Sequence, residues 1–306
     1  MVSSIPGLEN LLRDCDLPNV FKMKRGSSGL DFFMKETLTM TRASGLVLNT
    51  FDELEAPTIT NLTTVFPRVY TIGPLHTHLK NQLPQNPSLS LNVRTQDRSC
   101  ITWLDHQKAK SVLYVSFGTV VKLSEEQLLE FWHGLVNSLK PFLWVVRKDL
   151  MNGKAGFGDN VAEELELGTR ERGFLVEWAP QEEVLAHPAL GGFLTHCGWN
   201  STVECIGEGV PMLCWPFMVD QTVNGRCVSE QWGIGVGIDG NFDRLVIEKM
   251  VKDVLENRIE GLRNSVDEIA KQARDSVEQT GSSSRNLESM IKDMMTMKEQ
   301  NIQHKK

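Results

Sequence analysis

The segment Thr195–Thr202 has the spacing most suggestive of chemistry in this chain. An apolar run ends at His196, Gly198 permits a turn, and Asn200 and the two hydroxyl residues after it are types that cap helices. A helix start offers free N–H groups and a positive dipole end, which attract anions. His196 could donate to a diphosphate without a metal, and Glu204, one turn into the helix, could accept from a ribose diol. A capped helix with a packed histidine fits the same pattern, so both interpretations stay open.

Two further strand ends carry polar groups. In the first, Gly118 allows close backbone approach and the Thr119 hydroxyl can bond a phosphate oxygen, although many strands end in Gly-Thr simply to turn. In the second, Asp220 and Gln221 follow the buried run ending at Pro216. This pair could hydrogen-bond adjacent sugar hydroxyls, or could be a helix cap and its neighbour.

Strand and helix patterns alternate along the chain, which predicts an α/β fold with a parallel sheet. We expect strands at 111–119, 142–147, 173–178, 191–196, 210–216 and 234–238, with helices between them. Ser124 and Gln127 form a capping-box pattern for the helix after the first of these strands. In such a sheet ligands bind beyond the carboxyl ends of the strands, so the three polar strand ends should converge.

The remaining segments suggest a second, smaller α/β part. Before residue 76 we expect a helix at 30–42, a strand at 45–51, a helix from Asp52 and a strand at 69–75. The polar stretch 76–100 contains two prolines and no periodicity, which predicts a linker or exposed loop. From about 243 to 298 the pattern is helical, with a break at 281–284 and with Met250, Val254 and Leu262 as core contacts. The expected divisions are 1–75, a linker at 76–100, a ligand-binding domain at 101–280, and a C-terminal helix and tail at 281–306.

Composition excludes several classes of protein. A net charge of −7 argues against nucleic-acid binding, and no apolar run reaches the roughly 18 residues of a membrane span. We find no signal peptide, and six cysteines without a CxxC pair fit reduced thiols in the cytoplasm. His76 and His78 lack further metal ligands nearby, so we expect a solvated loop there. No G-x-G-x-x-G follows an early strand, which disfavours a dinucleotide-dependent dehydrogenase.

The 44 residues 178–221 resemble the signature box of plant family 1 UDP-glycosyltransferases. The matching positions are Trp178, Pro180, Gln181, His187, Gly192, His196, Gly198, Trp199, Asn200, Ser201, Glu204, Gly209, Pro211, Pro216, Asp220 and Gln221. The resemblance continues outside the box, through LVLNTFDELE, VLYVSFGT and FLWVVR, over essentially the whole chain. Val219 departs from it, standing where the family usually has a smaller residue.

The resemblance implies a fold and a nucleoside site. The family has the GT-B fold, in which two doubly wound, Rossmann-like domains face each other. Residues 101–280 resemble the C-terminal, UDP-sugar-binding domain, and 1–75 resemble only a remnant of the N-terminal, acceptor-binding domain. Trp178 would stack on uracil, a contact worth about 1–3 kcal/mol by analogy with other base–aromatic pairs. The Ala179 backbone would bond the uracil edge, and Gln181 and Glu204 would hold the ribose.

The resemblance also assigns the rest of the donor. The diphosphate would be held by Thr119, His196, Asn200 and Ser201. The sugar would be held by Trp199, Asp220 and Gln221. The last box position is Gln221 and not His, and in this the chain resembles the members of the family that prefer glucose. No metal or cofactor is implied besides the UDP-sugar.

The family's catalytic base is expected to be missing. An early His with an Asp partner deprotonates the acceptor, and neither has a counterpart in this sequence, so no catalytic residue is assigned. We therefore expect a UDP-glucose-dependent, inverting O-glucosyltransferase of small hydroxylated plant metabolites in truncated form. The alternative is an inactive UDP-sugar-binding remnant, or a partner of an intact enzyme, associating through the open strand near residues 46–51.

Overall fold

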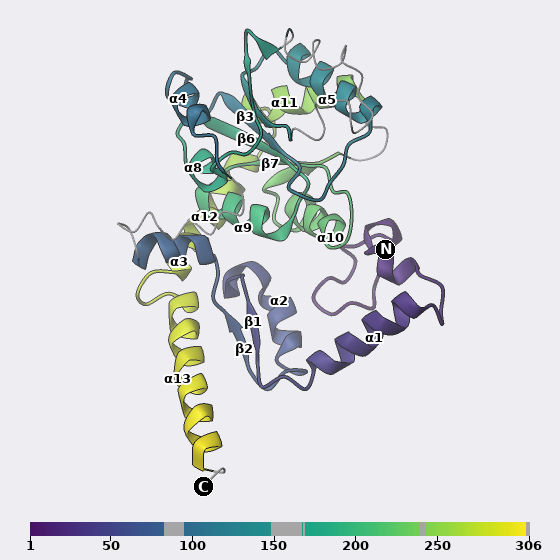
Figure 1. Cartoon of the computed structure of the whole chain (residues 1–306), viewed down its shortest axis with the longest axis vertical. Coiled ribbons are helices and arrows are strands. Elements are labelled where there is room, and N and C mark those ends of the chain that lie inside the picture. Colours follow the sequence, from purple (N-terminus) through teal and green to yellow (C-terminus); the bar gives the residue numbers. More distant parts are fainter. Residues whose placement is uncertain (83–94, 148–166, 168, 239–242, 304–306) are drawn as a thin grey trace. The chain divides into compact units, whose positions relative to one another are not determined.

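A computed structural model of the chain describes residues 1–82, 95–147, 167, 169–238 and 243–303. The chain forms two compact units (Figure 1). Unit 1 comprises Met1–Asn86 and Glu268–Lys306, and unit 2 comprises Pro87–Asp267. Among the described residues, no helix is both long and apolar enough to cross a membrane.

Unit 2 is built on a parallel sheet of six strands in the order β5-β4-β3-β6-β7-β8. The strands are β3 (Val112–Ser116), β4 (Phe142–Val145), β5 (Gly173–Val176), β6 (Leu190–Thr195), β7 (Met212–Cys214) and β8 (Gly235–Gly237). The strand order reverses direction between β3 and β6, as in doubly wound folds. The predicted α/β fold with a parallel sheet is therefore confirmed, and its six strands lie where the apolar runs placed them.

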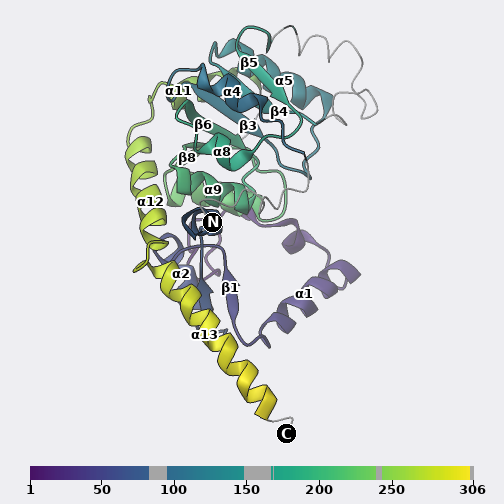
Figure 2. The ribbon, with the colours of Figure 1, turned by 60° about the vertical axis from the view of Figure 1, so that its left-hand side comes forward.

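Helices cover both faces of this sheet, because strands buried on both faces need apolar cover on each side. The helices α5 (Glu125–Asn137) and α11 (Arg244–Leu255) lie on one face, and α8 (Gln181–Leu185), α9 (Trp199–Glu208) and α10 (Gln221–Arg226) lie on the other (Figures 1 and 2). A short helix, α4 (Ser99–Asp105), precedes β3, and a π-helical turn, Cys227–Gln231, follows α10. The largest fully buried side chains of unit 2 include Tyr114, Phe131, Phe142, Trp144 and Phe193.

Local signals place α5 and α11. The capping box predicted for α5 is confirmed: the Gln127 N–H donates to Ser124 Oγ at 3.2 Å, and the Ser124 N–H donates to Gln127 Oε1 at 3.0 Å. In α11 the expected core residues Met250 and Val254 are buried, as is Leu262 at the start of the next helix.

Unit 1 contains a two-stranded parallel sheet of β1 (Leu46–Leu48) and β2 (Val69–Thr71). Its helices are α1 (Ser28–Met40), α2 (Asp52–Leu62), α3 (Leu75–Gln82) and α13 (Ser282–Gln303), and two short 3-10 turns, Asp14–Asp16 and Asn19–Lys22, precede α1. The helix α12 (Leu262–Ser276) crosses the division between the units.

The C-terminal helix α13 completes unit 1 by packing along β2. Tyr70 donates its hydroxyl to Asp293 at 2.5 Å, and Asn286 Nδ2 donates to Thr71 Oγ1 at 2.8 Å. These contacts join residues more than 200 positions apart, which explains why residues 268–306 cluster with the N-terminal segment. Residues 268–280, which the sequence pattern places in the ligand-binding domain, cluster here with unit 1.

The stretch after Pro74 differs from the predicted linker. Residues Leu75–Gln82 form α3, and His78 is buried, so the expectation of a solvated loop is wrong there. Its polar composition and the prolines that follow conceal a two-turn helix. Burial, with a smaller contribution from Lys80, lowers the pKa of His76 to about 4. The rest of the predicted linker up to residue 94 lies outside the described residues.

The cysteines are free thiols, and five of the six are buried, with Cys15 exposed. Cys197 and Cys214 lie together behind the strand ends, where burial and their proximity raise the pKa of the Cys197 thiol. They act as small core residues.

Candidate functional site

Three polar strand ends converge at one edge of the unit 2 sheet. The strands β3, β6 and β7 are hydrogen-bonded neighbours, and their last residues, Ser116, Thr195 and Cys214, are in register. Because all three strands are parallel, their carboxyl ends share one edge, at the point where the strand order reverses. The loops that follow them therefore start side by side.

His196 is held between two glycines at this edge. A methyl group added at Gly118 would lie 2.7 Å from the imidazole, and one added at Gly198 would lie 2.5 Å from Nε2. Gly118 also has a φ of +67°, which favours glycine for a second reason. The ring is thus tightly enclosed by backbone from the β3 and β6 loops, and only glycine leaves room for it.

The imidazole of His196 is half-buried, and burial lowers its pKa, although a hydrogen bond with the Ser116 backbone and the charge of Asp220 oppose this. A neutral imidazole still donates one hydrogen bond, although it brings no charge. Positive potential for an anion must then come from the backbone at the start of α9.

The helix α9 begins differently from the prediction. Its first residue is Trp199, and the N-cap is Gly198, which has no side chain to cap with. The expectation that Asn200, Ser201 or Thr202 caps the helix is wrong, because these residues already lie inside its first turn; the Thr202 hydroxyl instead donates to the Gly198 carbonyl at 3.1 Å. No side-chain cap from Gly198 competes for the first N–H groups of α9, which suits them to an anion.

A polar cluster joins α8 to α9 beside this helix start. Gln181, the first residue of α8, donates from Nε2 to Ser201 Oγ at 2.9 Å and to Glu204 Oε2 at 2.7 Å. The buried Tyr114 hydroxyl donates to Gln181 Oε1 at 3.3 Å and so supports the cluster from β3. The structure thus brings together the two residues expected at a ribose, and adds Ser201, which had been assigned to the diphosphate. Nothing in the sequence singles out Tyr114, because its contact with Gln181 depends on how β3 and α8 are placed in the fold.

The residues before α8 lie close to this cluster in sequence. Trp178 is half-buried, and its carbonyl accepts a hydrogen bond from the Asp97 N–H at 2.8 Å. Ala179 is buried, and Gln181 follows two residues later. The hydrogen bond from Asp97 fixes the backbone of Trp178, whose indole is expected to stack on uracil.

The loop after β7 is braced by its own side chains. Gln221 is buried, and its Oε1 accepts from the N–H groups of Phe217 and Met218 at 3.0 and 2.9 Å. Only its Nε2 can therefore address a ligand without breaking those bonds. Val219 has a φ of +57°, which is unusual for a β-branched residue and strains the backbone of this loop.

The carboxylate of Asp220 is exposed and makes no side-chain cap to α10, although Asp220 occupies the N-cap position. It accepts from Asn224 Nδ2 at 2.8 Å, and the same amide donates to the Cys197 carbonyl at 2.9 Å. Asn224 therefore ties the β7 loop to the β6 loop, and sequence reasoning missed it. Of the other expected residues, Thr119 and Asn200 are exposed, and the Trp199 ring lies 6.3 Å from that of Trp232.

A metal centre is not evident in this part of the molecule. Across the described ranges, no group of three or more His, Cys, Asp or Glu side chains is arranged to hold an ion.

Comparisons with known proteins bear on the family and the fold of the chain. The family described as "UDP-glucoronosyl and UDP-glucosyl transferase" matches residues 34–268. The chain is 46% identical over 301 residues to a 7-deoxyloganetic acid glucosyltransferase of Catharanthus roseus, covering 95% of this chain and 61% of that protein. It is 45% identical over 287 residues to mogroside I-A1 synthase of Siraitia grosvenorii, covering 90% of this chain and 54% of that protein.

Among solved structures, the chain resembles Os79 from O. sativa in complex with UDP, with a TM-score of 0.82 and 30% identity, over 94% of this chain and 63% of that one. It also resembles a UDP-glucose: anthocyanidin 3-O-glucosyltransferase in complex with UDP, with a TM-score of 0.82 and 25% identity, over 97% of this chain and 64% of that one. The chain thus spans about three fifths of the length of these relatives.

Proposed function

Because the chain belongs to the UDP-glucoronosyl and UDP-glucosyl transferase family, we propose that unit 2 binds a UDP-sugar, with UDP-glucose preferred. As part of a whole enzyme, it would supply the donor for inverting O-glucosylation of a small hydroxylated metabolite. The names of the relatives, several of which are glucosyltransferases of plant metabolites, support the sugar and the acceptor class.

The Gln181–Ser201–Glu204 cluster beside the start of α9 is the observation that carries the proposal. Glu204 is half-buried and already oriented by Gln181, so its carboxylate is placed to accept hydrogen bonds from a ribose diol. Trp178 would stack on uracil, with the Ala179 backbone bonding its edge. Two solved relatives contain UDP, which supports a UDP site in this chain.

For the diphosphate, we propose His196, Thr119 and the first turn of α9, including Asn200 and Ser201. These groups offer a neutral donor, a hydroxyl and backbone N–H groups with the helix dipole, so a metal is not required to attract the anion. Trp199, Asp220 and the Nε2 of Gln221 would face the sugar. The free cysteines fit a reducing compartment, and we propose the cytoplasm.

Titration of the 306-residue chain with UDP tests this site. Trp178→Ala should weaken binding through lost stacking, by about 1–3 kcal/mol, and Glu204→Ala through lost ribose contacts. Glu208→Ala, one turn further along α9, and Trp132→Ala on α5 are matched controls that should leave affinity unchanged. UDP affinity that is the same in Trp178→Ala, Glu204→Ala and the wild type would remove the assignment.

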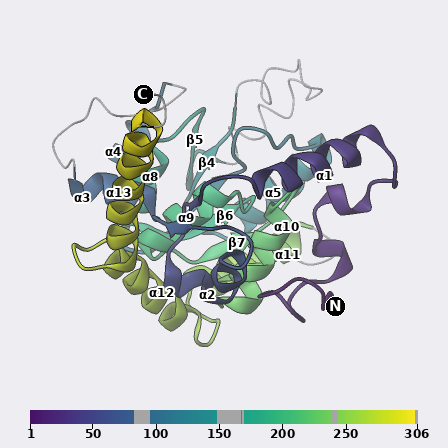
Figure 3. The same cartoon turned by 90° about the horizontal axis from the view of Figure 1, so that it is seen from below.

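A second candidate is a UDP-sugar-binding partner of another polypeptide, and α1 is the observation that favours it. No residue of α1 is buried, and Phe32, Met34 and Leu38 are each more than half exposed. Within unit 1, α1 stands apart from α13 (Figures 1 and 3). Val47 of the short strand β1 is half exposed as well. Large apolar side chains exposed on a helix in this way are typical of an interaction site.

We propose that the occupant of this surface would be the acceptor-domain portion of a relative that this chain does not match. Co-expression with that portion should yield a stable complex by light scattering, and Leu38→Glu should abolish it. A chain that stays monomeric in its presence would refute this second candidate without affecting the UDP site.

A further inference from the structure

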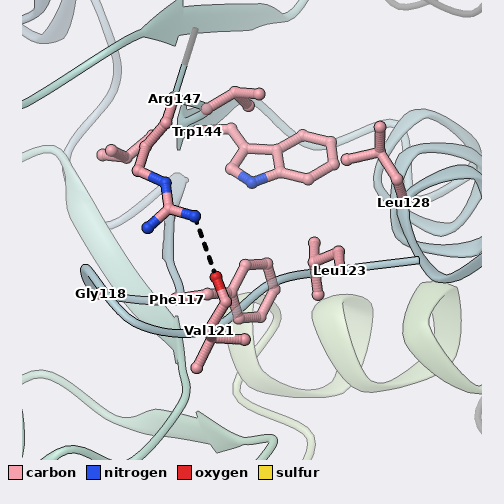
Figure 4. A pocket seen from close by; sticks show the side chains of 9 residues that line it. Phe117, Gly118, Val121, Leu123, Leu128, Trp144 and Arg147 are labelled. Carbon is pink, nitrogen blue, oxygen red and sulfur yellow. Dashed lines mark hydrogen bonds between the residues drawn. The ribbon is translucent and has the colours of Figure 1, made fainter. Parts of the chain in front are cut away.

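A small hollow lies where β4 ends against the loop that follows β3 (Figure 4). Its walls are mainly apolar, with Phe117 and Val121 from the loop, Leu128 from α5 and Trp144 from β4. Arg147 is the one charged residue among those lining it, and it is only 6% exposed. A buried guanidinium is costly unless it is hydrogen-bonded, so its contacts indicate what it is for.

Both terminal nitrogens of Arg147 bond the backbone of the β3–α5 loop. Nη2 donates to the Val121 carbonyl at 3.2 Å (Figure 4), and Nη1 donates to the Thr119 carbonyl. The two carbonyls flank Val120, whose side chain is 67% exposed. Residues 119–121 belong to neither a helix nor a strand, so no regular backbone hydrogen bonding holds them. The guanidinium therefore fixes this loop from its inner side.

The same loop forms one wall of the candidate donor site. Gly118 precedes Thr119 and lies against the imidazole of His196, and Thr119 is one of the groups assigned to the diphosphate. A displacement of the Thr119 carbonyl would move both the Thr119 hydroxyl and the glycine that encloses His196. Arg147 thus acts on the site indirectly, through the loop backbone whose carbonyls it binds.

We propose that Arg147 is a positioning residue for the diphosphate subsite, which it preorganises by clamping the Thr119 and Val121 carbonyls. This inference rests on the proposed function of unit 2. A loop that must be ordered at the moment of binding costs affinity, whereas a loop already ordered does not. The effect should therefore be confined to ligands that carry phosphates.

The test compares UDP with uridine, which lacks the diphosphate. Arg147→Gln in the 306-residue chain should weaken UDP binding about tenfold, equal to about 1.4 kcal/mol, while uridine affinity stays within twofold. Arg147→Lys keeps the charge but has one nitrogen instead of a fork, so its UDP affinity should lie between wild type and Arg147→Gln. Arg244→Gln removes another arginine of unit 2, one that pairs with Glu130, and should leave both affinities unchanged.

The outcomes separate the possibilities. A selective loss for UDP, graded from Lys to Gln, supports the proposal, and circular dichroism confirms that the variants fold. Equal losses for UDP and uridine would show a general structural role and overturn it, as would unchanged UDP affinity in both variants. If Arg147→Gln does not fold, Arg147→Lys alone decides between these results. Absence of UDP binding by the wild type would refute the proposed function itself, and this inference with it.

Discussion

The glycine at position 198 offers a direct test of His196. Gly198 has φ −62° and ψ 138°, which an alanine adopts without backbone strain. The added methyl group, however, would lie 2.5 Å from His196 Nε2, about 1 Å inside ordinary contact. Gly198→Ala should therefore act on UDP binding by displacing the imidazole, and it also replaces the N-cap of α9 by a residue less favourable there.

The expected cost to UDP binding is that of one hydrogen bond to a charged group. Such bonds contribute about 1.5–3 kcal/mol, so Gly198→Ala should weaken UDP binding by about 10- to 150-fold. Overpacking should also lower the free energy of unfolding, by about 1–3 kcal/mol, unless the ring rotates away freely. Calorimetric titration measures the first quantity and thermal denaturation the second.

The double variant makes this reasoning refutable. In a His196→Ala background there is no ring to displace, so Gly198→Ala should then have almost no further effect on UDP affinity. Strong non-additivity is the signature of two positions acting through one contact. If Gly198→Ala costs the same affinity with and without His196, the steric argument is wrong, and the backbone of α9 is the part that responds.

Three other predictions follow from the site and the fold. UDP affinity should change less than twofold when a chelator is added, because the α9 start and His196 can meet the diphosphate directly; a tenfold fall would reveal a metal. The free energy of unfolding should decrease as pH falls from about 6.5, the ordinary histidine value, towards 4. This is because the unfolded chain binds a proton at His76 that the folded one, with a pKa of about 4, does not. Burial also lowers the pKa of His78 and of His196, which act in the same direction; His76→Gln should therefore reduce the slope in that part of the profile, and an unchanged slope would contradict the prediction. The isolated 306-residue polypeptide should form little glucoside from UDP-glucose over a panel of phenols and alcohols. The reason is that the resemblance assigns the general base, typically worth about 10²–10⁴-fold in rate, to residues that this chain does not match. Rapid turnover would show that another residue acts as the base, and His196 would be the first to replace.

Sequence reasoning succeeded where the signal is local. The buried runs at 112–116 and 190–195 read as strands because a parallel strand covered on both faces is continuously apolar. Ser124 and Gln127 were recognisable because a capping box spans only four residues.

Local signals also misled in two places. The run Asn200-Ser201-Thr202 offered three good caps, but the turn at Cys197, with a φ of +63°, starts α9 earlier and leaves Gly198 as the N-cap. The helix α3 was hidden by polar residues, because a short helix can be fixed by packing more than by its own pattern.

By itself, the sequence determined the parallel α/β fold and the group of strand ends at which polar residues gather, since periodicity and turn residues act over a few positions. Only the tertiary structure decided which of those residues touch. Gln181 meets Ser201 and Glu204 across two helices, and Arg147 holds a loop that lies 26 and 28 residues earlier in the chain. Such contacts depend on strand register and on the path of each loop, which no short window of sequence specifies.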